Sequence, residues 1–152
     1  MDAGVRTGAE VVVFVTRRRG AETLIAHRSP EQGGYWHVIA GGVETGETAS
    51  AAAVRELREE TGLVARCVQP VPPVRYAYSL AEEPEQRRRL YPPGVAEVQV
   101  TCFHAEAPDD WEPHLDWEHD DHRWCAADDA AASLRWRDTA EALRSVLAAI
   151  SS

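Results

Sequence analysis

The stretch "RELREETG", residues 55–62, constrains this chain more than any other, because it crowds three carboxylates into a predicted helix. The helix is predicted from the alanine-rich run of residues 48–61. At 3.6 residues per turn, Glu56, Glu59 and Glu60 project within an arc of about 100°. Such a face is either a solvated surface balanced by neighbouring arginines or a site for a divalent cation. Hard oxygen ligands of this kind suit Mg²⁺ or Mn²⁺.

Residues upstream of the helix extend this stretch into a longer pattern. The spacing reads G-x5-E-x7-R-E-U-x-E-E-x-G-U, where U is aliphatic, and it resembles the Nudix box without a mismatch. A chance match at so many positions is expected less than about once in a million chains of this length. The residues that fill the pattern are Gly41, Glu47, Arg55, Glu56, Leu57, Glu59, Glu60, Gly62 and Leu63.

The resemblance implies a fold and a reaction class. It implies an α+β protein with the Nudix fold, an α/β/α sandwich around a mixed sheet, as one domain over residues 1–152 with its box at residues 41–63. It also implies an enzyme that hydrolyses a phosphoanhydride bond with Mg²⁺ or Mn²⁺ as cofactor. The metal neutralises phosphate oxygens and lowers the pKa of a bound water.

Each box position acquires a role from the same resemblance. Glu56 and Glu60 are expected to be the main metal ligands and to face outward from the helix. Glu59 is a further ligand or the group that orients water, and either Glu56 or Glu59 is the general base. Arg55 is expected to hold neighbouring carboxylates by charged hydrogen bonds. Glu47 precedes the helix, where negative charge is favoured.

A backbone carbonyl before the box glycine belongs to the family pattern and falls on Ala40, which is expected to contact metal and substrate. Here "VIAGG" replaces the more usual "LPGG", so the position of that carbonyl is open.

Three further segments resemble, in order and spacing, the bacterial dihydroneopterin triphosphate pyrophosphatases within this family. They are "ETLIAHRSPEQGGYW", "RRRLYPPGV" and "WEHDDHRWCAADDAAASLRWRD". This likeness implies Glu118 as an additional metal ligand and Arg28, Arg6 and Trp136 as substrate contacts. The alternatives are that Glu118 is one acid of an acidic loop, that Arg28 is a surface arginine and that Trp136 belongs to the core. Ala40 and Gly62 depart from that subfamily.

The substrate class therefore has alternatives. The expected reaction is release of pyrophosphate from dihydroneopterin triphosphate. The next candidates are general nucleoside triphosphate or dinucleoside polyphosphate hydrolysis, and the third is a nucleotide-binding Nudix module without catalysis. The run Arg87 to Arg89 either clamps a triphosphate or is a solvated loop.

Charge and cysteine content limit the partners. The net charge is -9, and all 16 basic residues are arginine, which argues against nucleic acid as partner and leaves a small phosphorylated substrate. Three cysteines without paired spacing predict reduced thiols. The short run "VVVFV" is no membrane span, so we expect a cytoplasmic monomer or homodimer without membrane contact.

Hydrophobic periodicity predicts the remaining elements. Strands are expected at residues 11–15, 23–28, 36–43, 64–68, 74–80, 95–105 and 122–125. The segment "EEPEQRRRLYPPG" is expected to be a loop, and residues 139–150 an amphipathic helix. Asp138 and Glu141 resemble a capping box for that helix, while Thr48 and Gly62 are expected to cap the box helix.

Overall fold

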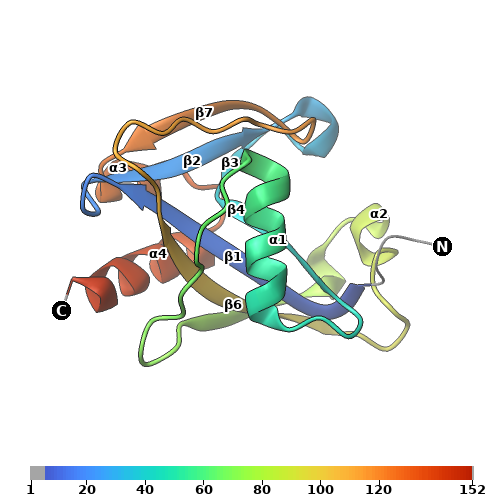
Figure 1. Ribbon diagram of the computed structural model, residues 1–152. Coiled ribbons are helices and arrows are strands. Elements are labelled where there is room, and N and C mark those ends of the chain that lie inside the picture. Colours follow the sequence, from blue (N-terminus) through green and yellow to red (C-terminus); the bar gives the residue numbers. More distant parts are fainter. Residues whose placement is uncertain (1–5, 152) are drawn as a thin grey trace.

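The structure, a computed structural model, describes residues 6–151, which form a seven-stranded mixed sheet with helices on both faces (Figure 1). The expected domain limits, Met1 and Ser152, lie outside this range. The strands are β1 (Arg6–Arg17), β2 (Glu22–Arg28), β3 (Trp36–His37), β4 (Ile39–Glu44), β5 (Arg75–Ser79), β6 (Glu97–Glu106) and β7 (His119–Cys125). The helices are α1 (Ala49–Thr61), α2 (Glu85–Arg88), α3 (Ala127–Ser133) and α4 (Arg137–Ile150).

Strand β1 is the centre of the sheet. The strand order is β3-β2-β1-β6-β5, with β4 also paired to β1 and β7 also paired to β2. β1 and β6 run parallel, and the other pairs are antiparallel. Because β1 is buried on both faces, its sequence is a continuous apolar run rather than an alternating one. The mixed sheet agrees with the expected fold class.

Two hydrophobic clusters lie on opposite faces of β1. On one face Val11, Val13 and Val15 pack with Ala53 and Leu57 of α1. On the other face, a second cluster contains Val12 and Phe14 of β1 together with residues of α3 and α4. The sheet is therefore the middle layer between α1 and the α3–α4 pair, which is the expected sandwich (Figure 1).

The sheet splits near the start of the box, and this split positions the site. β1 and β2 pair only at Thr16↔Thr23 and Arg17↔Glu22. Beyond that point β4 pairs with β1 while β3 pairs with β2, so the chain passes between the two halves at residue 38. The expected strand at residues 36–43 is thus two strands, and Gly41 and Gly42 lie on β4.

Helix α1 begins and ends as the sequence predicts. The Thr48 hydroxyl accepts a hydrogen bond from the Ala51 amide at 3.1 Å. Gly62 follows the last turn with a φ of 81°, and its amide donates to the Arg58 carbonyl. A left-handed residue without a side chain stops the helix at this point.

The expected strand at residues 64–68 is wrong. The segment makes an isolated bridge between Val68 and His104, and otherwise it has no strand pairing. β5 pairs with β6 only as far as Thr101, and beyond it, in the described part of the chain, only Val68 bridges to that edge. Prolines at 70, 72 and 73 also lack the amide that a ladder needs.

The C-terminal helices also differ from expectation. α4 begins at Arg137 with Trp136 at the N-cap and no side-chain capping bond, so the expected capping box is wrong. Asp138 lies inside the first turn, where it can interact with the helix dipole but cannot cap. Neither α3 nor the turn α2 within the expected loop was predicted, because each is shorter than the window in which helical periodicity becomes visible.

Two smaller expectations can be compared with the structure. Cys67, Cys102 and Cys125 are free thiols, as expected. Within residues 6–151, no helix has the length and apolar character needed to cross a membrane.

Leu57→Ala should destabilise the protein by about 2–5 kcal/mol, because it removes a fully buried side chain between α1 and β1. Val64→Ala is the control, since Val64 is 74% exposed and its truncation should change stability by about 0.5 kcal/mol or less. Equilibrium urea unfolding measures both. Equal shifts in the two midpoints would contradict this packing.

Candidate active site

Arg55 is the centre of the polar contacts around the box. Its Nε and Nη2 bind the two carboxylate oxygens of Glu47 at 2.8 and 3.0 Å, and Nη2 also donates to the Gly42 carbonyl at 2.9 Å. Nη1 donates to Glu56 at 2.6 Å and to Glu59 at 3.3 Å. These bonds lower the pKa of the Glu47 carboxyl and raise that of Arg55. Arg55 thus ties β4 to α1, and the expected partners of this arginine are all present.

The box glycine makes room for a carboxylate. A Cβ atom at Gly41 would lie 2.1 Å from Cδ of Glu56, so no other residue fits there without moving the carboxylate. Ala40, immediately before it, pairs with Val12 on β1. The absence of a side chain at position 41 lets the Glu56 carboxylate rest directly against the backbone of β4.

Glu60 does not face outward, and that expectation is wrong. It is 2% exposed, on the side of α1 that meets His119 at the start of β7. Its Oε1 has no hydrogen-bond partner among the described residues and lies 3.7 Å from Nε2 of His119, which is also enclosed and unbonded. Nδ1 of His119 is 2.9 Å from Asp116. Burial raises the pKa of Glu60 well above its ordinary value, and the charges of Glu56, Glu118 and Asp116 raise it further.

Glu118 joins this group from the loop before β7. The Ser29 amide donates to the Glu118 carbonyl at 2.8 Å, which fixes the loop against the end of β2. Its carboxylate lies 3.6 Å from Nη2 of Arg28, and that nitrogen donates to Gln32 at 2.9 Å. Partial burial raises the pKa of Glu118, with contributions from the charges of Asp116 and Glu56.

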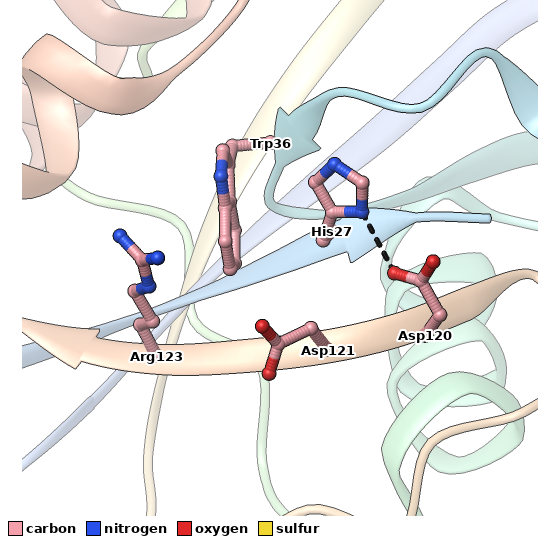
Figure 2. Close-up of a pocket in the computed structure, with 5 residues that line it drawn as sticks. All are labelled: His27, Trp36, Asp120, Asp121 and Arg123. Carbon is pink, nitrogen blue, oxygen red and sulfur yellow. Dashed lines mark hydrogen bonds and ion pairs between the residues drawn. The ribbon is translucent and has the colours of Figure 1, made fainter. Parts of the chain in front are cut away.

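The acids that follow Glu118 on β7 point to a different part of the surface. Asp120 binds Nδ1 of His27 at 2.7 Å, and Asp121 lies beside it on the same side of β7, near Trp36 and Arg123 (Figure 2). These residues line an open surface pocket rather than the region of Glu60. The fold therefore separates Glu118 from Asp120, although they are two residues apart.

The carboxylates that could hold a cation are those of Glu56, Glu60 and Glu118. Within residues 6–151, the structure shows no group of three or more His, Cys, Asp or Glu side chains arranged to hold a metal ion. Glu60 Oε1 nevertheless is buried without a partner, and an unpaired buried carboxylate is costly unless a proton or a cation compensates it. The donor set is all oxygen, which fits Mg²⁺ or Mn²⁺. Glu59 is exposed at the edge of this group.

The expected substrate contacts fall in different places. Arg28 is buried, so its interpretation as a surface arginine is wrong. Trp136 is 39% exposed and meets the ring of Tyr35 edge-on, so it is not a core residue. Arg6 lies over the ring of Tyr91, in a separate polar cluster. The structure brings Arg28 next to Glu118 and leaves Arg6 and Trp136 outside that contact.

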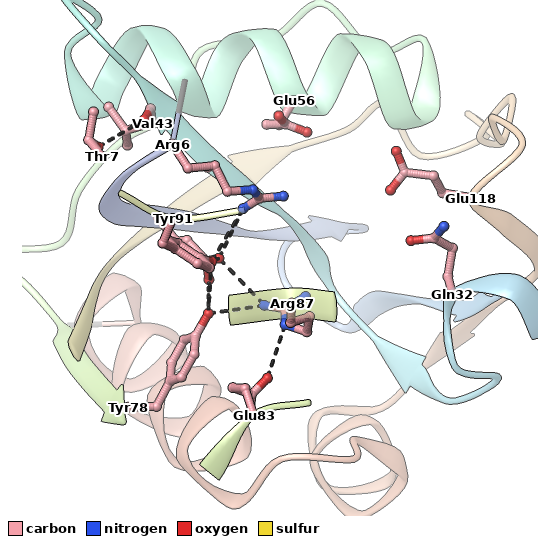
Figure 3. A network of polar contacts seen from close by, with 12 residues as sticks. Arg6, Thr7, Gln32, Val43, Glu56, Tyr78, Glu83, Arg87, Tyr91 and Glu118 are labelled. Carbon is pink, nitrogen blue, oxygen red and sulfur yellow. Dashed lines mark hydrogen bonds and ion pairs between the residues drawn. The ribbon is translucent and has the colours of Figure 1, made fainter. Parts of the chain in front are cut away.

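This polar cluster was missed by sequence reasoning. Glu10 accepts hydrogen bonds from the hydroxyls of Tyr78 and Tyr91 and from Arg6, and Arg87 donates to Tyr78 (Figure 3). Burial raises the pKa of both tyrosines, so both are neutral donors near pH 7. One signal was available, since Glu10 is an acid immediately before the apolar run of β1. His119, His37 and Gln32 carried no such signal.

Comparison with known proteins assigns this arrangement to a family. The sequence profile described as "NUDIX domain" matches residues 6–146. The chain belongs to the Nudix family. The solved structures that share its fold are Nudix hydrolases, which act on pyrophosphate bonds.

Two solved structures share the Nudix fold along their whole length. The E. coli dihydroneopterin triphosphate pyrophosphohydrolase has a TM-score of 0.78 and 22% identity, covering 98% of this chain and 99% of that one. The C. elegans Ap4A hydrolase has a TM-score of 0.70 and 20% identity, covering 94% and 97%. At these identities the likeness establishes the fold.

A curated relative gives a closer sequence match over part of its length. The Myxococcus xanthus protein named "Octanoyltransferase" is 34% identical over 136 residues, which is 88% of this chain and 35% of that protein. The chain spans well under half the length of the curated relatives that it matches.

Glu60→Gln should weaken the dependence of metal-free stability on pH. Because the folded pKa of Glu60 is raised, its proton stabilises the fold fully below the ordinary carboxylate pKa, about 4.3, and this contribution is lost as pH rises through the folded value. Glutamine removes that loss, which amounts to at most about 1.4 kcal/mol per pH unit.

Urea unfolding between pH 4.5 and 8 in chelator measures this slope, with exposed Glu82→Gln as the matched control. If parent, control and Glu60→Gln show one common slope, the buried-carboxylate assignment fails.

Proposed function

We propose that the chain is a Mg²⁺- or Mn²⁺-dependent pyrophosphohydrolase of a small nucleoside triphosphate-like substrate. The observation that carries this proposal is the buried Glu60 Oε1, which has no partner among the described residues and faces the region where Glu56 and Glu118 interact with it. A divalent cation would compensate these charges, and when bound it would neutralise phosphate oxygens and lower the pKa of a coordinated water.

The residues of this chain would then position and activate the reactants. Arg55 fixes the orientation of Glu56, and Gly41 lets that carboxylate rest against β4, where the Ala40 carbonyl precedes it. Glu47 holds Arg55 from the other side. Glu59 is exposed, so it can accept a proton from water, and Glu56 is the alternative base. Preorganised charges of this kind lower the barrier without rearrangement.

Dihydroneopterin triphosphate is the proposed substrate, with pyrophosphate as a product. The support is a fold shared from end to end with the E. coli pyrophosphohydrolase, together with the buried Arg28 beside Glu118. The fold likeness to Ap4A hydrolase supports dinucleoside polyphosphates as the second candidate. A binding module without catalysis is disfavoured, because all the box carboxylates are retained.

Acyl transfer, the activity in the name of the Myxococcus xanthus relative, is not proposed for this chain. The chain has no lysine. Burial raises the pKa of Cys67 to about 11 and of Cys102 to about 12, so neither thiol is an activated nucleophile.

A substrate panel tests the proposed function. Phosphate and pyrophosphate release should be followed for dihydroneopterin triphosphate, GTP, dATP and diadenosine tetraphosphate, with Mg²⁺ and with excess chelator. We expect activity only with metal and a kcat/KM at least about tenfold higher for the pterin, since a pocket that binds ring edges leaves its polar groups unpaired with the wrong ring. Undiminished turnover in chelator would refute the metal site, and a preference for a nucleotide would refute the pterin assignment.

Glu118→Gln should reduce activity about tenfold or more and raise the Mg²⁺ concentration needed for half-maximal rate, because it removes a charged oxygen next to Glu60. Asp120→Asn is the matched control, since Asp120 pairs with His27 at the open surface pocket, and its rate should stay within about twofold. Equal effects of the two substitutions would show that Glu118 is an ordinary loop acid.

A further inference from the structure

The three consecutive arginines at 87–89 are divided by the turn α2 into one that faces inward and two that face outward. The side chain of Arg87 is 35% exposed, whereas that of Arg89 is 73% exposed and Arg88 is also exposed. Arg88 donates to the Glu83 carbonyl, and Arg89 pairs with Glu85 four residues earlier. Arg88 and Arg89 thus contact only residues close to them in sequence. Arg87 is the arginine of this run that faces the interior of the protein.

Arg87 is held in place at two of its three nitrogens. Nη2 donates to the Tyr78 hydroxyl at 3.1 Å and lies 3.6 Å from Glu10. Nε lies 3.0 Å from Glu83 but, without hydrogen-bond alignment, remains an enclosed donor. Nη1 has no hydrogen-bond partner in the described part of the chain and is not enclosed. The guanidinium is therefore ordered while one edge is available to a ligand, the condition under which an arginine binds an anion at low entropic cost.

Arg28 has the same arrangement on the side of Glu118. Its Nη2 is bonded to Gln32 and lies near Glu118, its Nε is enclosed without a hydrogen bond, and its Nη1 has no hydrogen-bond partner among residues 6–151. Buried donors without partners are rare in folded proteins, and they indicate a group that a ligand completes. In Figure 3, Arg87 and Gln32 turn their polar ends toward one region beneath α1, which Glu56 and Glu118 also face.

His37 links the two arginines electrostatically. Its Nδ1 is enclosed and has no hydrogen-bond partner among the described residues, although the ring as a whole is only half-buried. Burial lowers the pKa of His37 to about 3, and the charges of Arg28 and Arg87 lower it further. Both guanidiniums are thus within electrostatic range of one neutral imidazole, and all three groups carry unused hydrogen-bonding capacity.

We propose that Arg87 binds the phosphate chain of the substrate, with its Nη1 donating to a phosphate oxygen. The inference rests on the proposed function only in requiring a polyphosphate ligand at the site, and binding does not require turnover. It makes Arg87 a substrate-binding residue and Arg88 and Arg89 solvated neighbours.

Calorimetric titration tests this assignment. The probe is a guanosine triphosphate analogue in which methylene groups replace both bridging oxygens of the triphosphate, titrated with Mg²⁺ present. Arg87→Ala should weaken binding about tenfold or more, the effect of losing a charge-assisted hydrogen bond, while Arg88→Ala should stay within about twofold. Guanosine without phosphates should show no difference between the two variants. Equal weakening by both substitutions, or an equal loss for guanosine, would overturn the proposal.

A second variant distinguishes a loss of binding from a folding defect. Arg87→Gln keeps a donor for Tyr78 but removes the charge, so it should preserve the thermal midpoint and still bind the analogue about tenfold more weakly. Parent-like affinity in this variant would overturn the proposal. If the protein binds the analogue through Arg87 but shows no turnover, the phosphate-binding role of Arg87 is supported and the proposed hydrolase activity is refuted.

Discussion

The hydrogen bonds of Arg55 are the interaction on which the rest of the site depends. One guanidinium joins the Gly42 carbonyl on β4, Glu47 before α1, and Glu56 and Glu59 on α1. Without this cation, the carboxylates would repel one another and the loop would lose its attachment to the helix. The same contacts explain the fixed spacing of the box, because an arginine at this position reaches each partner at 2.6 to 3.3 Å.

The burial of Glu60 is a second constraint, and it destabilises the folded protein where the Arg55 bonds stabilise it. The fold places this carboxylate against His119 with one oxygen unbonded, which a fold selected only for stability would avoid. Local destabilisation of this kind is common where charge must be concentrated for binding or catalysis. A raised pKa couples stability, protonation and cation binding at one residue. The folded protein is therefore expected to be least stable when the site is metal-free and Glu60 is deprotonated.

The split of the sheet explains how distant segments meet. β1 and β2 separate after two residue pairs, and the short strands β3 and β4 bring Trp36 to Glu44 into the divergence. This arrangement lets Arg28 approach from β2, the glycines from β4 and Arg87 from α2. In Figure 3, Glu56 of α1, Glu118 and Gln32 lie around one region.

The sequence by itself determined the box and the limits of α1, because these depend on local spacing and helix capping, and the mixed-sheet fold followed from the resemblance of the box to the Nudix family. The Thr48 and Gly62 caps and the Arg55 partners could be read in this way. Only the tertiary structure decided which side chains of a local cluster face the site. Glu60 is buried beside His119 at the start of β7, and Glu118 is separated from Asp120 by the register shift in the β2–β7 pairing. Arg87 points away from Arg88 and Arg89 because successive residues of a helical turn differ in direction by about 100°. The failed strand at 64–68 has the same cause, since pairing depends on how the segment approaches its neighbour, and here only Val68 reaches β6.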